Sequence, residues 1–167
     1  ARVQLSAAMN PCPCGWMDDT SGRCRCRPHQ VEGYRHRVSG PLLDRIDLHV
    51  EVQPVRMEAL RRPAGERSRV VYGRVAAARE RQTRRLAGTG RVTNGELTAR
   101  EVQRFCRLAP AAEALLREAV ERLQLSARAY HKLLKSARTI ADLDGSGRIQ
   151  TSHVAEAVQY RALDRAP

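Results

Sequence analysis

Aromatic residues are scarce in this sequence, where one Phe, one Trp and four Tyr make up 4% of 167 residues. The hydrophobic core must therefore be aliphatic, which favours helices over an aromatic-rich all-β sandwich. No run approaches the roughly 20 apolar residues of a membrane span, and the first residues show no signal-peptide pattern. The five Cys are an odd number, which argues against a secreted disulfide framework. We expect a mostly α, cytoplasmic protein that has no membrane partner.

Acidic residues are also few, because 18 Asp and Glu face 30 Lys and Arg, for a net charge of +12. A charge this large implies an anionic partner such as nucleic acid, an acidic membrane or an acidic protein. The excess is concentrated in residues 61–91, which hold ten Arg against two Glu. Four of these arginines are the candidates for nucleic-acid binding: Arg74, Arg81, Arg84 and Arg85. The alternative is a solvated helix face without a partner.

The hydrophobic pattern changes character near residues 54–66. Before this point, residues 3–9 form an apolar run and residues 46–52 alternate with period 2, which predicts two short strands. Helices are predicted at 28–38 and from Pro41. After it, helical spacing predicts helices at 66–87, 98–106, from 110, from a Ser126 cap, and at 152–163. We therefore expect two domains, residues 1–60 with a Cys-rich insertion at 11–28, and residues 66–167 as a helical domain.

Four of the five cysteines lie within fifteen residues, as the pairs Cys12 and Cys14 and Cys24 and Cys26. Four thiolates suit a closed, tetrahedral structural zinc site. The one-residue spacing within each pair is tighter than the usual two, and His29 is an alternative ligand. Free thiols and redox chemistry remain open readings.

The segment from Asp142 to Gly147 resembles the start of a calcium-binding EF-hand loop. Asp142, Asp144 and Ser146 match its first ligand positions. The last position requires a bidentate Glu, but this chain has His153 there. We therefore expect a turn between two helices instead of a calcium site.

Four strings are more specific than these patterns: residues 7–15 (AAMNPCPCG), 39–48 (SGPLLDRIDL), 126–129 (SARA) and 137–143 (ARTIADL). Together they closely resemble the ComM/YifB family of magnesium-chelatase-like AAA+ ATPases, which are linked to DNA uptake and recombination. The resemblance covers essentially the whole chain. It implies the C-terminal part of an AAA+ core with residual strands, followed by a helical lid.

The resemblance also implies roles for three residues. Asn10 resembles sensor 1, which orients the attacking water, and Arg45 resembles an arginine finger for the neighbouring subunit's nucleotide. Arg128 resembles sensor 2, which contacts the phosphates. The plainer readings are a turn cap for Asn10, a surface ion pair for Arg45 and a basic helix residue for Arg128. Identical subunits in a ring, expected as a hexamer, ATP with Mg²⁺, and DNA are the implied partners.

A phosphate-binding G-x-x-x-x-G-K-[ST] loop is missing from this sequence. We therefore expect this chain to be an excised C-terminal part that does not hydrolyse ATP alone, since the loop's backbone cradle is absent. Its two strands would lack neighbours and be marginal. Two alternatives remain: a basic zinc-knuckle module that binds nucleic acid without catalysis, and a subunit of a metal chelatase.

Overall fold

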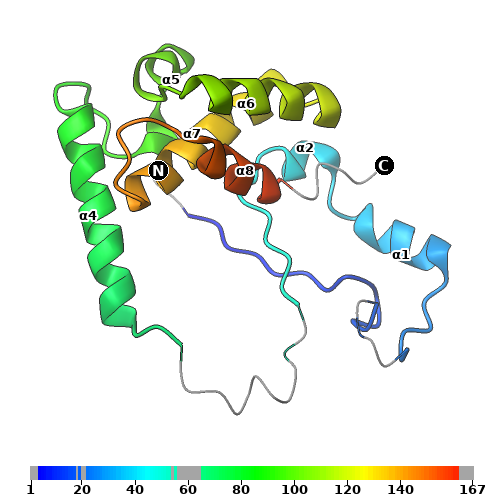
Figure 1. Ribbon diagram of the computed structural model, residues 1–167. Helices are drawn as coiled ribbons and strands as arrows, with labels where there is room; N and C mark the ends of the chain where they lie inside the picture. The colour runs from blue at the N-terminus through cyan, green and yellow to red at the C-terminus, as the bar shows by residue number, and fades with distance from the viewer. Residues whose placement is uncertain (1–3, 18, 20–21, 54, 56–64, 162–167) are drawn as a thin grey trace. The chain divides into compact units, whose positions relative to one another are not determined.

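The computed structural model describes residues 4–17, 19, 22–53, 55 and 65–161 (Figure 1). The chain is mostly helical, as its aliphatic composition predicts. It divides into two compact units. The first unit comprises Ala1–Leu43 and Glu51–Arg62, and the second comprises Asp44–Val50 and Pro63–Pro167. The segment Asp44–Val50 therefore belongs to the helical second unit, although the sequence pattern groups it with the first.

In its described residues, the first unit contains two helices, α1 (Pro28–Arg35) and α2 (Gly40–Leu43). Pro28 occupies the first helical position, where the missing N–H costs no hydrogen bond. Both predicted helices are confirmed, although α1 ends three residues earlier than expected. The Cys-rich segment precedes α1 and is irregular in its described residues.

Neither predicted strand forms within the described residues. Residues 4–10 and 46–53 pair with no sheet. Leu5 and Met9 remain 75% and 50% exposed, so the first apolar run covers no core. A strand needs a neighbour to satisfy its backbone groups, and a described neighbour is lacking here. Among the described residues, β pairing is limited to one parallel bridge between Leu108 and Ile149.

The second unit is a helical bundle organised around one long helix, α7 (Ala127–Leu143). α7 contacts α4, α5, α8 and a 3₁₀ turn, and α8 also contacts α6 (Figure 1). The bounds of these elements are α4 (Ser68–Leu86), η1 (Asn94–Glu96), α5 (Ala99–Phe105), α6 (Pro110–Leu123) and α8 (Thr151–Gln159). All five predicted helices of this region are confirmed. The last helix ends at Gln159, before its predicted end at residue 163, and residues 162–163 lie outside the described residues.

The core of the bundle is aliphatic, as predicted. The apolar faces of α6 and α7 meet there, with Leu116, Leu133 and Ala137 buried. Ser126 caps α7 by accepting a hydrogen bond from the Ala129 amide at 3.1 Å, which confirms the predicted cap. Cys106 is 3% exposed within this cluster, and burial raises the pKa of its thiol to about 11. It is therefore a small buried hydrophobe.

The apolar stripe of α4 is only partly buried. Ala78 and Leu86 lie in the interior, but Val70, Val71 and Val75 are 52%, 38% and 46% exposed. These three valines are therefore not part of the core. Only the C-terminal half of α4 is covered by the bundle, and helical periodicity gives no indication of how far a partner surface extends.

A buried charged network links α4 to α7. The carboxylate of Asp142, which is 1% exposed, accepts hydrogen bonds from Arg85 and from Asn94, and forms an ion pair of 3.1 Å with Arg138. Arg81 donates to the Asp142 carbonyl at 2.8 Å. Asp142 therefore points into the bundle, away from any cation in the following loop. The expected turn is confirmed there, with Gly145 in the left-handed region at φ 75°.

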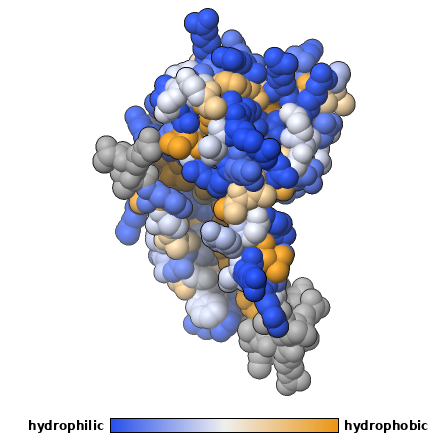
Figure 2. Space-filling view, turned by 90° about the vertical axis from the view of Figure 1, so that its left-hand side faces the viewer, coloured by the Kyte–Doolittle hydropathy of each residue, from blue (hydrophilic) through white to orange (hydrophobic). Residues whose placement is uncertain are grey.

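The face shown in Figure 2 is largely hydrophilic with scattered hydrophobic patches. Within the described residues, the helices are all too short or too polar to cross a bilayer.

Candidate functional site

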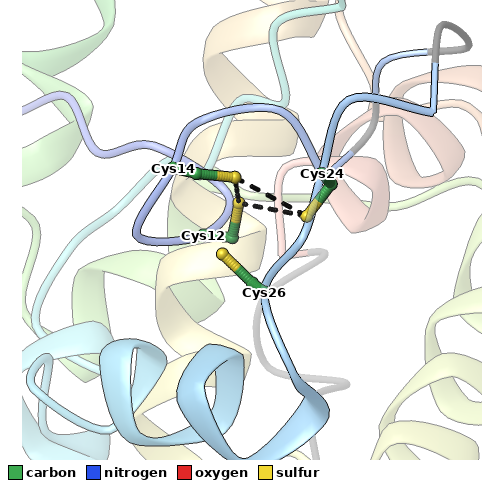
Figure 3. A group of neighbouring side chains, drawn as sticks. All are labelled: Cys12, Cys14, Cys24 and Cys26. Carbon is green, nitrogen blue, oxygen red and sulfur yellow. Dashed lines mark hydrogen bonds between the residues drawn. The ribbon is translucent and has the colours of Figure 1, made fainter.

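The four cysteines of the cysteine loop, residues 11–28, meet at one point in the first unit (Figure 3). Their sulfur atoms all lie within 4.8 Å of one another. Cys12 Sγ lies 3.3 Å from Cys14 Sγ and 3.8 Å from Cys24 Sγ, and Cys14 and Cys24 are 3.6 Å apart. Four sulfurs around one Zn²⁺ at about 2.3 Å would be separated by roughly 3.8 Å. The donor set and its spacing therefore fit a metal ion, and the one-residue spacing within each pair does not prevent it.

Local backbone geometry brings the first pair together. The Gly15 amide donates to the Cys12 carbonyl at 3.0 Å, and Gly15 adopts φ 81°, so the chain turns tightly between the two thiols. A backbone hydrogen bond at Trp16 and the adjacent Cys12 thiol lower the pKa of Cys14 to about 6. A hydrogen bond shared with Cys14 raises the pKa of Cys26 to about 12. One thiolate is thus favoured at neutral pH, and metals bind thiolates.

Asn10, the predicted sensor 1, immediately precedes the cysteine loop and is exposed. Its side-chain amide lies 3.5 Å from the position that a Cβ atom on Gly15 would occupy. The residue is thus placed beside the turn that carries Cys12 and Cys14.

Arg45, the predicted arginine finger, is exposed on a segment that is fastened to the helical unit. The side chain of Asp44 lies 3.4 Å from the Ser126 hydroxyl, and Asp47 forms an ion pair of 3.0 Å with Lys132. The buried guanidinium of Arg161 donates to the Ile46 carbonyl at 2.8 Å. These contacts flank Arg45 on both sides. We call Asp44–Val50 with these contacts the finger segment.

Arg128, the predicted sensor 2, lies in the first turn of α7 and is also exposed. It follows Ser126, the capping residue that contacts Asp44. The finger segment and Arg128 are therefore joined through the same helix end. A helix N-terminus carries partial positive charge, so Arg128 in the first turn adds to a local potential that favours an anionic group.

The four arginines predicted to bind nucleic acid have different surroundings on α4. Arg85 is committed to Asp142 and Asn94, and Arg81 to the Asp142 carbonyl. Arg74 forms an exposed ion pair of 2.7 Å with Glu66, and Arg84 lies 3.9 Å from Glu80. Arg81 and Arg85 therefore hold α4 on α7, whereas Arg74 and Arg84 remain exposed at the surface.

Sequence reasoning missed two features. Arg161 is 1% exposed and supports the finger segment, but as one of 30 basic residues it carries no distinguishing signal. Trp16 is 42% exposed, and the Arg23 guanidinium lies over its ring at 3.6 Å from the centroid. The position of the single Trp between cysteines and arginines in the sequence could have indicated the exposed Trp16.

Comparisons with known proteins agree along the whole chain. Residues 65–161 match the family described as magnesium chelatase, subunit ChlI C-terminal, and residues 1–60 match magnesium chelatase, subunit ChlI. The chain is 43% identical over 167 residues to the uncharacterized protein YifB of Salmonella typhimurium and 42% identical to the competence protein ComM of Haemophilus influenzae. YifB of Escherichia coli is 44% identical. Each alignment covers 99% of this chain and 32% of the relative, so the chain spans about a third of the length of these curated relatives.

Proposed function

Because this chain belongs to the magnesium chelatase subunit ChlI family, we propose that it is the C-terminal part of a cytoplasmic AAA+ ATPase motor acting on DNA. In this proposal, identical subunits form a ring, and ATP and Mg²⁺ are bound with a phosphate-binding loop outside the 167 residues. Asn10 is sensor 1, Arg45 the arginine finger and Arg128 sensor 2. The charge of +12 and the relative described as a competence protein support DNA as the substrate.

The observation that carries the proposal is the joining of Arg45 and Arg128 on one unit. Ser126 caps α7 and contacts Asp44, so the residue before Arg45 and the helix end that bears Arg128 touch. Both arginines are exposed and hence accessible to a nucleotide. A guanidinium supplied by one subunit stabilises charge on the phosphoryl group transferred in its neighbour, an effect worth about 10³ to 10⁵ in rate.

The test uses the full-length protein, wild type and Arg45→Ala, assayed for ATP hydrolysis with and without DNA. Wild type should be stimulated by DNA, and Arg45→Ala should lose about 10³-fold or more of kcat. Arg100→Ala, which removes an exposed arginine elsewhere in the second unit, is the matched control and should retain activity.

Mixed rings sharpen the test. Arg45→Ala subunits combined with subunits whose phosphate-binding loop is inactivated should regain activity, because each supplies what the other lacks. Absence of this complementation, or hydrolysis indifferent to Arg45, would contradict the finger assignment. Hydrolysis indifferent to DNA, but coupled to metal insertion into a tetrapyrrole, would favour the chelatase alternative, since a shared fold does not establish a shared function.

The sulfur cluster supports a second, structural proposal. We propose that Cys12, Cys14, Cys24 and Cys26 bind one Zn²⁺ as a closed tetrathiolate site. Such a site has no open coordination position, so its contribution is to hold the cysteine loop in shape. With few apolar contacts in the loop, metal binding would supply much of its folding free energy.

A further inference from the structure

We propose that the cysteine loop is a contact surface for single-stranded DNA, in which Trp16 stacks on a base while Arg25 and Arg27 bind phosphates. The inference rests on the proposed function as a DNA motor and names the surface that would touch the substrate. The principal contact with DNA would then lie in the cysteine loop and not on the arginine-rich helix α4.

Arginines outnumber acidic residues in and just after the second half of the cysteine loop. Residues 22–37 hold five arginines and one acidic residue, Glu32. Within the described part of the chain, Arg25 and Arg27 form no ion pair, and both are exposed. On α4, by contrast, Arg74 and Arg85 have carboxylate partners. Exposed positive charge without a described carboxylate partner is therefore present next to the cysteines.

Cysteine and arginine alternate along residues 23–27. Arg23, Arg25 and Arg27 are exposed, while Cys24 and Cys26 are partly buried. In an extended chain, successive side chains point to opposite sides, so alternate residues lie about 6.6 Å apart on one side. Turning both thiols toward the sulfur cluster thus turns the arginines outward. The metal-binding geometry and the basic surface are two consequences of one pattern.

Trp16 is an exposed aromatic residue of the same loop. Arg23 covers one face of its ring at 3.6 Å, and Arg23 is itself held by Asp19 through an ion pair of 2.6 Å. The ring is thereby oriented, while 42% of the residue remains accessible. This is the only Trp in a chain poor in aromatics, and it lies outside the core. Exposed aromatics beside arginines are the stacking platforms of single-strand binding proteins.

Single-stranded DNA suits these features better than a duplex or an acidic protein. In a duplex the bases are already stacked on one another, so no base is free to stack on an aromatic ring at the protein surface. An acidic protein would use the arginines but leave Trp16 without a role. The combination of an oriented ring and guanidinium groups without a described ion-pair partner therefore favours a strand with unstacked bases.

The experiment measures binding of fluorescent oligo-dT and of a duplex by the full-length, zinc-loaded protein at several salt concentrations. Arg25→Glu/Arg27→Glu should weaken oligo-dT binding at least tenfold and reduce the salt slope by about 1.4, for two lost phosphate contacts. Trp16→Ala should weaken oligo-dT binding about fivefold or more with little effect on the salt slope. Arg100→Glu/Arg117→Glu, with the same charge change on the helical unit, is the control and should bind nearly as wild type.

The outcomes separate this inference from the proposed function. If wild type binds no DNA, the motor proposal fails. If wild type binds oligo-dT and the cysteine-loop variants bind it equally well, only the surface assignment is overturned. Equal losses in both double variants would show a non-specific charge effect, and displacement of oligo-dT by polyglutamate at equal charge concentration would favour an acidic protein partner. Retained zinc content in each variant shows that the loop is intact.

Discussion

Cys24 provides the most direct test of the proposed zinc site. Its sulfur lies within 3.8 Å of both Cys12 and Cys14 sulfurs, so it is a central member of the cluster. Cys24→Ser should reduce bound zinc from one equivalent to none detectable after dialysis, because serine is a poor zinc ligand.

The control for this experiment is Cys106→Ala, which removes a buried thiol of the other unit and should leave the zinc content unchanged. Zinc content is measured by elemental analysis of the full-length protein. One full equivalent of zinc in Cys24→Ser would contradict the four-cysteine assignment.

The role of an arginine on α4 depends on the residues that surround it. Arg84 and Arg85 are neighbours on α4, yet Arg84 is exposed and Arg85 is bound to a buried carboxylate. Both match the same pattern of basic residues in the sequence. Their different roles depend on Asp142, which lies 57 positions away from Arg85.

The finger segment is the element through which the helical unit positions Arg45. Arg161→Ala removes the hydrogen bond to the Ile46 carbonyl. It also removes the guanidinium that lies 3.8 Å from the Asp44 carboxylate. The segment should then loosen, and a displacement of about 1 Å of a catalytic group costs up to ~100-fold in rate. We expect reduced ATP hydrolysis by the full-length protein together with faster hydrogen exchange at the His49 amide, which bonds to the Tyr160 carbonyl at 2.8 Å.

Exchange in the core of α7 distinguishes positioning from general destabilisation. Core amides of α7 should keep their protection in Arg161→Ala, and Arg100→Ala should change neither exchange nor activity. Unchanged activity with a loosened finger segment would argue against a role for Arg45 in hydrolysis.

Helix ends in the second unit follow local rules that act independently of the rest of the chain. Thr98 and Glu101 form a capping box at the start of α5, in which Glu101 accepts from the Thr98 amide at 2.8 Å and Thr98 from the Glu101 amide at 3.3 Å. The hydrogen bond from the Thr98 backbone, followed by that from its hydroxyl, lowers the pKa of Glu101. Such signals span three residues, which is why the predicted helix positions agree with the structure.

The whole bundle depends on the buried charge of Asp142. Asp142→Ala would leave Arg138, which is 1% exposed, and the mostly buried Arg85 without their carboxylate. Removing one member of a buried ion pair costs about 3–5 kcal/mol, because the remaining charge is uncompensated. The global unfolding free energy, measured by exchange of the slowest amides of α7 in the full-length protein, should fall by this amount.

Asp144→Ala is the matched control, because its carboxylate is 70% exposed and contacts His153 at 3.1 Å. This variant should change stability by less than about 1 kcal/mol. Equal losses in the two variants would contradict the network. Calcium should stabilise neither the wild type nor the variants, since Asp142 is engaged within the bundle.

The sequence by itself determined the helices, the aliphatic core, the four-cysteine cluster and the family. These follow from local periodicity, capping residues and short strings, in which the interacting groups lie within a few positions of one another. The strings also predict roles for Asn10, Arg45 and Arg128, which remain to be tested. Among the described residues the two predicted strands do not form, because a strand depends on neighbours that its own pattern does not contain.

Only the tertiary structure decided which charged residues are neutralised inside the protein and which remain available. It paired Asp142 with Arg85, held the finger segment through Arg161, and left Arg25 and Arg27 without carboxylate partners among the described residues. The physical reason is that burial and ion pairing depend on distances between atoms far apart in the chain. Charge can be counted from a sequence, but its neutralisation is a property of the folded structure.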